Sequence, residues 1–160
     1  MRLEIHAVGR LQAGPERELA ERYLDRLAKT GPQIGLEFGG VAEHAESRAK
    51  SPSQRCREEA DKLLVQIAPG AAIIALDETG RNIGSETFAK NLGRMRDEGR
   101  AAAAFVIGGP DGLDDALRRK ADLTISFGAM TWPHQVVRVL LAEQLSRAVT
   151  ILSGHPYHRA

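Results

Sequence analysis

A glycine-rich turn follows an apolar run in the C-terminal third of the chain, and its composition suits a ligand site. This glycine turn comprises Gly108, Gly109, Pro110, Asp111 and Gly112. Adjacent glycines let a backbone approach a ligand closely and turn N–H groups towards it. The turn lacks Gly-Lys-Ser/Thr, so it is no Walker loop, and its spacing differs from the dinucleotide-binding fingerprint. A tight strand-to-helix turn without a ligand is the alternative, which the turn alone does not exclude.

A second candidate is the loop over residues 127–133, here called the Trp loop. It carries the only tryptophan, Trp132, beside Pro133, and the small residues Gly128 and Ala129 near its start. Such a loop is able to surround an adenine with backbone hydrogen bonds and an apolar wall. Taken alone, however, the loop favours an ordinary connection in which Trp132 packs on the core or on a partner.

The segment 134–150 shows helical spacing and is apolar almost all round. Its apolar residues are Val136, Val137, Val139, Leu140, Leu141, Leu145 and Val149. A helix of this kind is buried in a core or against another subunit. Glu143 and Arg147 are four residues apart, which predicts an ion pair on the helix. Arg138 needs a partner or a ligand if it is buried.

The tail of the chain is rich in side chains that suit RNA. It reads His155, Pro156, Tyr157, His158 and Arg159. Arginine suits a phosphate, and tyrosine and histidine suit stacking and hydrogen bonding to a base. Two histidines three residues apart could begin a metal site, but no carboxylate or cysteine nearby supplies further ligands, so we predict no metal. A frayed end is the alternative for the tail.

A basic stretch near residue 50 offers further phosphate contacts. It contains Arg48, Lys50, Arg55 and Arg57, although a solvated surface is the interpretation we prefer. Cys56 lies between two of these arginines, which would lower the pKa of its thiol. No base is placed to support nucleophilic catalysis, so we expect a structural role. A single cysteine excludes an intramolecular disulfide and fits a reducing compartment such as the cytoplasm.

The elements that position these motifs follow from periodicity and turn signals. We expect strands at 2–8, 33–38, 71–76, 102–107 and 123–126, and helices at 15–29, 53–67, 86–98, 113–120 and 134–150. Ser85 is a plausible N-cap for the third helix, and residues 77–80 form a turn. The alternation predicts an α/β domain with a mainly parallel sheet and helices on both faces. Ligands bind beyond the carboxyl ends of such strands, here after residues 76, 107 and 126.

Length and composition narrow the possible functions. A chain of 160 residues suits one domain with one core, and 42% hydrophobic with 27% charged residues is ordinary for a globular protein. No apolar run is long enough for a membrane span. The net charge of +1 excludes a strong polycation, so nucleic-acid binding needs a local patch or an oligomer. An aromatic content of 4% argues against a single-strand binder built on stacking platforms.

Together the motifs resemble the ribosomal RNA large subunit methyltransferase H family, which belongs to the SPOUT class of S-adenosylmethionine-dependent methyltransferases. The residues that carry the resemblance are Leu76-Asp77, the run from Phe105 to Leu113, Thr131-Trp132-Pro133-His134, Val137-Arg138-Val139-Leu140 and His155-Pro156-Tyr157-His158. The likeness spans nearly the full chain and is specific in its C-terminal motifs. Trp132 is a departure, because relatives often have an aliphatic residue there.

The resemblance implies a fold and a cofactor beyond what periodicity shows. The family's α/β sheet ends in a deep trefoil knot, here over about residues 71–153, followed by the tail at 154–160. S-adenosylmethionine lies bent in the knot. Carried over by motif, its contacts are Leu76, Gly108, Phe127, Gly128, Ala129, Met130, Thr131 and Trp132. The family is a homodimer in which the partner's tail completes the active site.

The resemblance also implies a reaction. The family methylates N3 of a pseudouridine in helix 69 of 23S rRNA, on the assembled 70S ribosome. Such a transfer needs positioning and removal of the N3 proton. The residues we expect to serve it are His134, Arg138, Tyr157, His158 and Arg159.

Three other functions stay open at this point. A SPOUT methyltransferase acting on another RNA such as tRNA is one, and a non-catalytic ribosome-binding knot protein is the second. The third is an unrelated nucleotide-binding protein of flavodoxin type. It would need a phosphate loop after the first strand, and residues 9–12 make a poor one.

Overall fold

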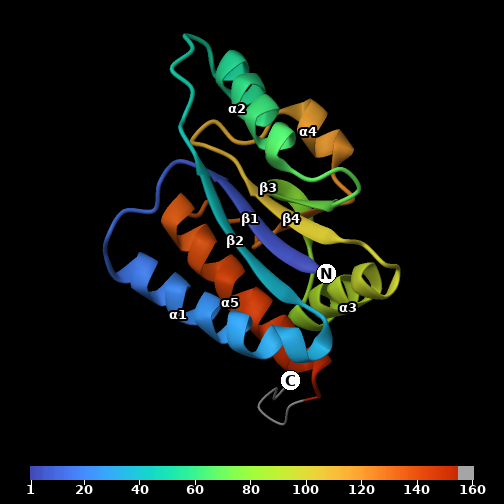
Figure 1. The fold of residues 1–160 in the computed structure, drawn as a ribbon. Coiled ribbons are helices and arrows are strands. Elements are labelled where there is room, and N and C mark those ends of the chain that lie inside the picture. The colour runs from blue at the N-terminus through green and yellow to red at the C-terminus, as the bar shows by residue number, and fades with distance from the viewer. Residues whose placement is uncertain (155–160) are drawn as a thin grey trace.

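A computed structural model describes residues 1–154, whose strands form one parallel sheet between two layers of helices (Figure 1). The strands are β1 (Arg2–Val8), β2 (Glu37–His44), β3 (Ala72–Asn82), β4 (Ala102–Ile107) and β5 (Leu123–Ser126). Their order is β2-β1-β4-β3-β5, and each of the four pairings is parallel. The central β4 is buried along its whole length, which explains its continuous apolar sequence. The predicted α/β fold is confirmed.

Helices cover both faces of this sheet. They are α1 (Pro15–Thr30), the short 3₁₀ helix η1 (Gly31–Ile34), α2 (Pro52–Gln66), α3 (Ser85–Asp97), α4 (Asp115–Lys120) and α5 (His134–Leu152). Helices α1, α3 and α5 lie on one side, where Phe105 of β4 meets Leu141 and Leu145 of α5 in the larger core. Helices α2 and α4 cover the other side, where Leu63 and Leu117 pack on the sheet.

The second strand begins later than predicted. Residues 33–38 were expected to be extended, but η1 occupies Gly31–Ile34 and β2 runs over Glu37–His44. Gly35 ends η1 in the left-handed region, with φ of 72°. The sequence of β2 contains two glycines and two acids, which are weak strand formers. It becomes a strand because it pairs with the edge of β1. This pairing is a tertiary contact, so the local sequence does not reveal it.

The starts of α3 and α4 also differ from prediction. Ser85 is not the N-cap of α3, because Gly84 takes that position and the Ser85 hydroxyl instead donates to Oε1 of Gln144 at 2.7 Å. Helix α4 begins at Asp115 rather than at residue 113. Its N-cap is Asp114, whose carboxylate accepts from the N–H of Ala116 at 2.7 Å. A side-chain cap therefore marks the start of α4, whereas α3 begins without one.

Strand β3 continues past the predicted turn at residues 77–80. Its pairing with β5 shifts register between Leu76 and Arg81, and within that irregular segment the N–H of Thr79 donates to Oδ1 of Asp77 at 2.9 Å. Gly80 allows the close approach that resumes pairing, because a Cβ there would lie 2.5 Å from the carbonyl carbon of Ile125. The residues that predicted a turn therefore form an irregular segment within β3.

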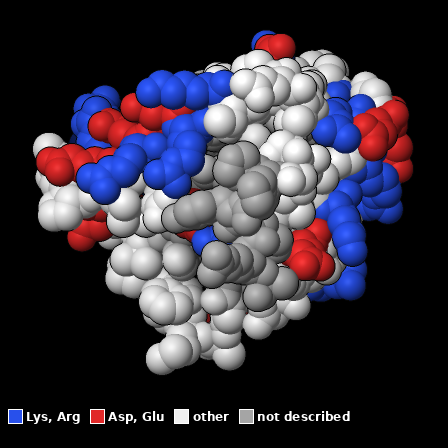
Figure 2. Space-filling view, turned by 90° about the horizontal axis from the view of Figure 1, so that it is seen from below, with Lys and Arg blue, Asp and Glu red and all other residues white. Residues whose placement is uncertain are grey.

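Charged side chains of both signs share the surface. On the face seen from below, Lys and Arg lie next to Asp and Glu at both sides of the view (Figure 2). This mixture agrees with the net charge of +1. None of the helices in residues 1–154 is long and apolar enough to cross a membrane.

Two histidines are buried where β1 and β2 lie side by side. The rings of His6 and His44 stack with centroids 6.0 Å apart. Within the described chain, both nitrogens of His6 and Nε2 of His44 have no hydrogen-bond partner. Burial, and then electrostatic interaction with His6 and Lys62, lower the pKa of His44 from its usual value. The folded protein therefore resists protonation of His44.

The lowered pKa of His44 predicts a loss of stability in mild acid. Above about pH 6.5 His44 is neutral in both the folded and the unfolded chain, so it does not change the free energy of unfolding with pH. As the pH falls below that value the unfolded chain binds the proton first, so the free energy of unfolding falls by up to about 1.4 kcal/mol per pH unit. Urea denaturation at pH 7.5 and 5.5 measures this. His44→Phe is expected to lose less stability over the same window, and an equal loss in both proteins would contradict the assignment.

Candidate functional site

A cavity of about 370 Å³ opens beyond the carboxyl ends of three neighbouring strands. Its wall includes residues 76–78 of β3, where the pairing with β4 ends, residues 107–113 from the end of β4 onwards, and residues 125–128 and 130–132 at the end of β5. Arg118 of α4 and His134 and Val137 of α5 complete the lining. The size is that of a small-molecule site, and the position is where ligands bind in parallel α/β sheets.

Most residues predicted to hold the cofactor meet in this cavity. Those that line it are Leu76, Gly108, Phe127, Gly128, Met130, Thr131 and Trp132. Ala129 is not among the lining residues. His134, the first predicted reaction residue, does line the cavity, whereas Arg138 lies elsewhere. Tyr157, His158 and Arg159 lie outside the described residues, so their role stays a prediction.

The glycine turn is folded tightly against itself. A Cβ on Gly108 would lie 2.6 Å from the carbonyl oxygen of Gly112, and a Cβ on Gly109 would lie 2.9 Å from Oε2 of Glu59. Gly112 has φ of 84°, in the left-handed region that favours glycine. Its N–H donates to the carbonyl of Gly109 at 2.9 Å. Glycine is thus required by the packing of the turn, and this packing shapes one wall of the cavity.

Local hydrogen bonds hold the Trp loop. The hydroxyl of Ser126 donates to the carbonyl of Gly128 at 2.9 Å, and Nε1 of Trp132 donates to the carbonyl of Phe127 at 3.4 Å. The Trp132 residue is 41% exposed and Met130 is 75% exposed. The indole therefore does not pack in the core of its own chain. It forms part of the cavity wall beside solvent.

An ion pair closes the side of the cavity between β3 and α4. Nη1 of Arg118 lies 3.2 Å from both carboxylate oxygens of Asp77, whose side chain is 6% exposed. Burial works against ionisation of Asp77, but hydrogen bonds from Thr79 and the Arg118 charge outweigh it and lower its pKa. Asp77 is therefore ionised and already paired. Glu78, next to it, is exposed and brings a second carboxylate to the wall.

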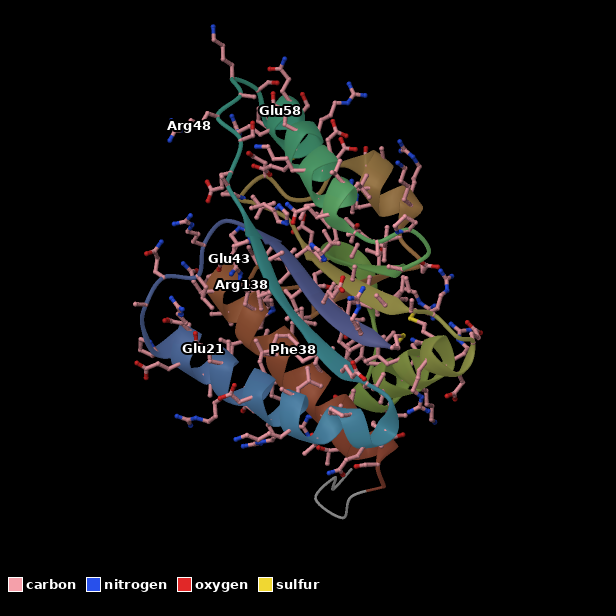
Figure 3. The ribbon with its side chains drawn as sticks, in the orientation of Figure 1. Glu21, Phe38, Glu43, Arg48, Glu58 and Arg138 are labelled. Carbon is pink, nitrogen blue, oxygen red and sulfur yellow. The ribbon has the colours of Figure 1, made fainter. Side chains whose placement is uncertain are left out.

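Arg138 is buried and bound to protein groups. Its guanidinium forms an ion pair with Glu43 of β2 and donates to the carbonyl of Gly9. Figure 3 shows the two side chains pointing towards each other between β2 and α5. Burial opposes ionisation of Glu43, but hydrogen bonds from the Leu11 N–H and from Arg138 lower its pKa below the usual value. The partner that a buried Arg138 requires is therefore Glu43.

Several lining residues were not predicted as site residues. They include Glu78, Ser126 and Arg118. Glu78 follows the predicted strand 71–76 and Ser126 ends β5, so position in the chain was the signal that could have found them. Arg118 carries no such signal, because its role depends on the packing of α4 against β3. Among residues 1–154, no group of three or more His, Cys, Asp or Glu side chains is arranged to hold a metal ion.

Comparison with known families decides which kind of protein this is. The sequence profile described as "Predicted SPOUT methyltransferase" matches residues 1–158. The chain belongs to this family. A protein of Chelativorans sp. (strain BNC1), named "Ribosomal RNA large subunit methyltransferase H", is 61% identical over 159 residues, covering 99% of this chain and 91% of the relative. A protein of the same name from Mesorhizobium japonicum is 56% identical over 160 residues, the whole of both chains. The resemblance to that family is confirmed.

Solved structures agree with the SPOUT fold. A probable methyltransferase from Bordetella pertussis has a TM-score of 0.52 at 16% identity, covering 92% of this chain and 95% of that one. A probable methylase family protein from Haemophilus influenzae has a TM-score of 0.50 at 12% identity, covering 99% of this chain and 70% of that one. At these identities the likeness shows the fold alone.

Proposed function

We propose that this SPOUT methyltransferase transfers a methyl group from S-adenosylmethionine to N3 of a pseudouridine in helix 69 of 23S rRNA, on the assembled 70S ribosome in the cytoplasm. The observation that carries the proposal is the cavity at the carboxyl edge of the sheet, where the glycine turn, the Trp loop and His134 meet. The names of relatives at 53–61% identity support the choice of large-subunit rRNA.

The residues of the cavity fit S-adenosylmethionine. Leu76, Ile107 and Trp132 supply the apolar wall that an adenosine group requires. The Glu78 carboxylate suits a ligand that carries an ammonium and a sulfonium group. Gly108, Gly109 and Gly112 of the glycine turn place backbone without side chains along another part of the wall. When bound, the cofactor supplies a methyl group activated on its sulfonium sulfur.

The protein's own task is to position the target base and remove its proton. His134 lines the cavity at the start of α5, and histidine is the side chain best suited to accept a proton near neutral pH. Holding the base in line with the methyl group contributes most of the acceleration. Tyr157, His158 and Arg159 are proposed to contact the RNA. Arg138, paired with Glu43, is proposed to hold the start of α5 rather than to touch the base.

A homodimer is part of this proposal, with the knot over about residues 71–153. One side of α5 packs on α1 and α3. Val136 and Leu140, one helical turn apart, are half-buried and stand outside the core clusters. Apolar side chains at that spacing suit the same surface of a second copy. Such a dimer allows the tail of one subunit to reach the cavity of its partner.

Transfer of labelled methyl groups tests the proposed substrate. The purified protein is incubated with labelled S-adenosylmethionine and, separately, with ribosomes, free 23S rRNA and tRNA from a strain that lacks the modification. Label at the helix 69 pseudouridine of ribosomes is the expected result. Label in tRNA alone would establish the alternative RNA substrate. Label in no RNA would leave the non-catalytic ribosome-binding protein.

Deletion of the tail separates binding from transfer. Truncation before His155 is expected to leave the affinity for S-adenosylmethionine unchanged and to abolish methyl transfer, because the cavity lies within residues 76–137. Calorimetry and the transfer assay measure the two effects. Mixing truncated subunits with Gly108→Val subunits, which keep their tails, is expected to restore transfer. No restoration in proven mixed dimers would show that each tail serves its own subunit.

A further inference from the structure

The glycine turn is fastened to α2 by a pair of charged side chains distant in the sequence. Nε of Arg55 donates to Oδ2 of Asp111 at 2.6 Å, and its Nη2 donates to Oδ1 of the same carboxylate at 3.1 Å. Two parallel hydrogen bonds of this kind fix direction as well as distance. The hydrogen bond from Arg55 also lowers the pKa of Asp111, so the carboxylate is ionised at neutral pH.

The same guanidinium is itself held in place. Its Nη1 donates to the carbonyl of Ala49 at 3.0 Å and to that of Lys50 at 3.4 Å. These carbonyls belong to the segment between β2 and α2, where Figure 3 shows Arg48 opposite Glu58. The segment is anchored by Glu59, which is buried and accepts from the N–H of Ser47 at 2.8 Å. Arg55 is therefore a fixed support and not a mobile surface side chain.

Two neighbours of Arg55 on α2 touch the turn as well. The thiol of Cys56 donates to the carbonyl of Asp111 at 3.4 Å. Burial, and then the charges of Asp111 and Glu59, raise the pKa of this thiol, opposite to the direction expected from its flanking arginines. Oε2 of Glu59 lies 2.9 Å from where a Cβ on Gly109 would stand. The first half of α2 is thus the surface against which the glycine turn packs.

We propose that Arg55 is a positioning residue for the glycine turn. Its two hydrogen bonds to Asp111 hold residues 108–112 in the form that makes one wall of the cavity, and tight binding of the methyl donor depends on them. This inference rests on the proposed function for its ligand, S-adenosylmethionine. Arg55 acts through Asp111 and does not touch the reacting atoms.

The consequence is a selective loss of cofactor affinity. Arg55→Ala is expected to raise the dissociation constant for S-adenosylmethionine and its KM by about tenfold, the effect of losing hydrogen bonds to a charged group. The kcat at saturating cofactor is expected to change by less than about twofold, since bound cofactor restores the turn. Arg57→Ala is the matched control. It removes the same charge from an exposed position on the same helix and is expected to leave both constants unchanged.

A double-mutant cycle distinguishes positioning from general destabilisation. If Arg55 acts through Asp111, Arg55→Ala and Asp111→Ala have similar effects on affinity, and the double variant is no weaker than either one. Additive losses would overturn the proposal. The proposal would also be overturned if Arg57→Ala lost as much cofactor affinity and thermal stability as Arg55→Ala, because the loss of a positive charge from α2 would then explain the effect.

The single cysteine provides a readout that does not depend on the cofactor. Cys56 is expected to react with a maleimide faster in Arg55→Ala than in the parent protein, since release of the turn uncovers the thiol. Unchanged labelling would refute the positioning role. Failure of the parent protein to bind S-adenosylmethionine would instead refute the proposed function, while the labelling experiment would still decide whether Arg55 holds the turn.

Discussion

Replacement of Gly108 by valine is expected to weaken S-adenosylmethionine binding by on the order of 100-fold. A Cβ at this position would lie 2.6 Å from the carbonyl oxygen of Gly112 and 3.0 Å from Cδ2 of Leu113. The contact is with backbone, so no side-chain rotation relieves it. The turn must open, and the wall of the cavity moves with it. Isothermal titration calorimetry measures the affinity, and thermal unfolding shows whether the rest of the fold survives.

The matched control is Gly84→Val. A Cβ on Gly84 meets nothing within 4 Å, its φ of −73° suits any residue, and it does not line the cavity. This variant is expected to bind the cofactor as the parent does. Normal affinity in a folded Gly108→Val protein would show that the glycine turn is not part of the cofactor site.

The strands that carry the site were predictable because their signals are local. Residues 102–107 and 123–126 match β4 and β5 to the residue. Strand β4 is buried along its whole length and is therefore a continuous apolar run, whereas β5 alternates apolar and polar residues between two helical segments. Strand β2 was misplaced because its glycines and acids carry no such run. Pairing with β1 and the left-handed Gly35 fix its position, and both depend on tertiary structure.

The cavity was predictable for a related reason. In a parallel sheet the carboxyl ends of the strands share one edge, so residues after 76, 107 and 126 had to be neighbours once the strands were placed. The partners of charged residues were not predictable. Arg138 meets Glu43 across 95 positions, and Arg55 meets Asp111 across 56. The pair Glu143–Arg147 was found because helical spacing alone brings it together, and it is confirmed.

Removal of Glu43 is expected to destabilise the fold more than removal of its partner. Glu43→Ala leaves the Arg138 guanidinium, whose side chain is 7% exposed, with the Gly9 carbonyl as its remaining acceptor among the described residues. An uncompensated buried charge of this kind costs about 3 kcal/mol. Arg138→Met removes the buried charge and leaves Glu43, 30% exposed, with the Leu11 N–H as a donor. The expected cost is about 1 kcal/mol.

Urea denaturation of the two single variants and of the double variant measures these effects. The double variant is expected to be more stable than Glu43→Ala alone, because no buried charge remains unpaired. Arg147→Ala, which breaks the more exposed Glu143 pair on the same helix, is expected to cost less than about 0.5 kcal/mol. A double variant no more stable than Glu43→Ala would mean that the pair does not explain the burial of Arg138.

Methyl transfer by the double variant then decides the role of Arg138. Activity near that of the parent shows that the arginine holds α5 against β2, whereas loss of transfer with normal cofactor affinity would place it in the reaction itself.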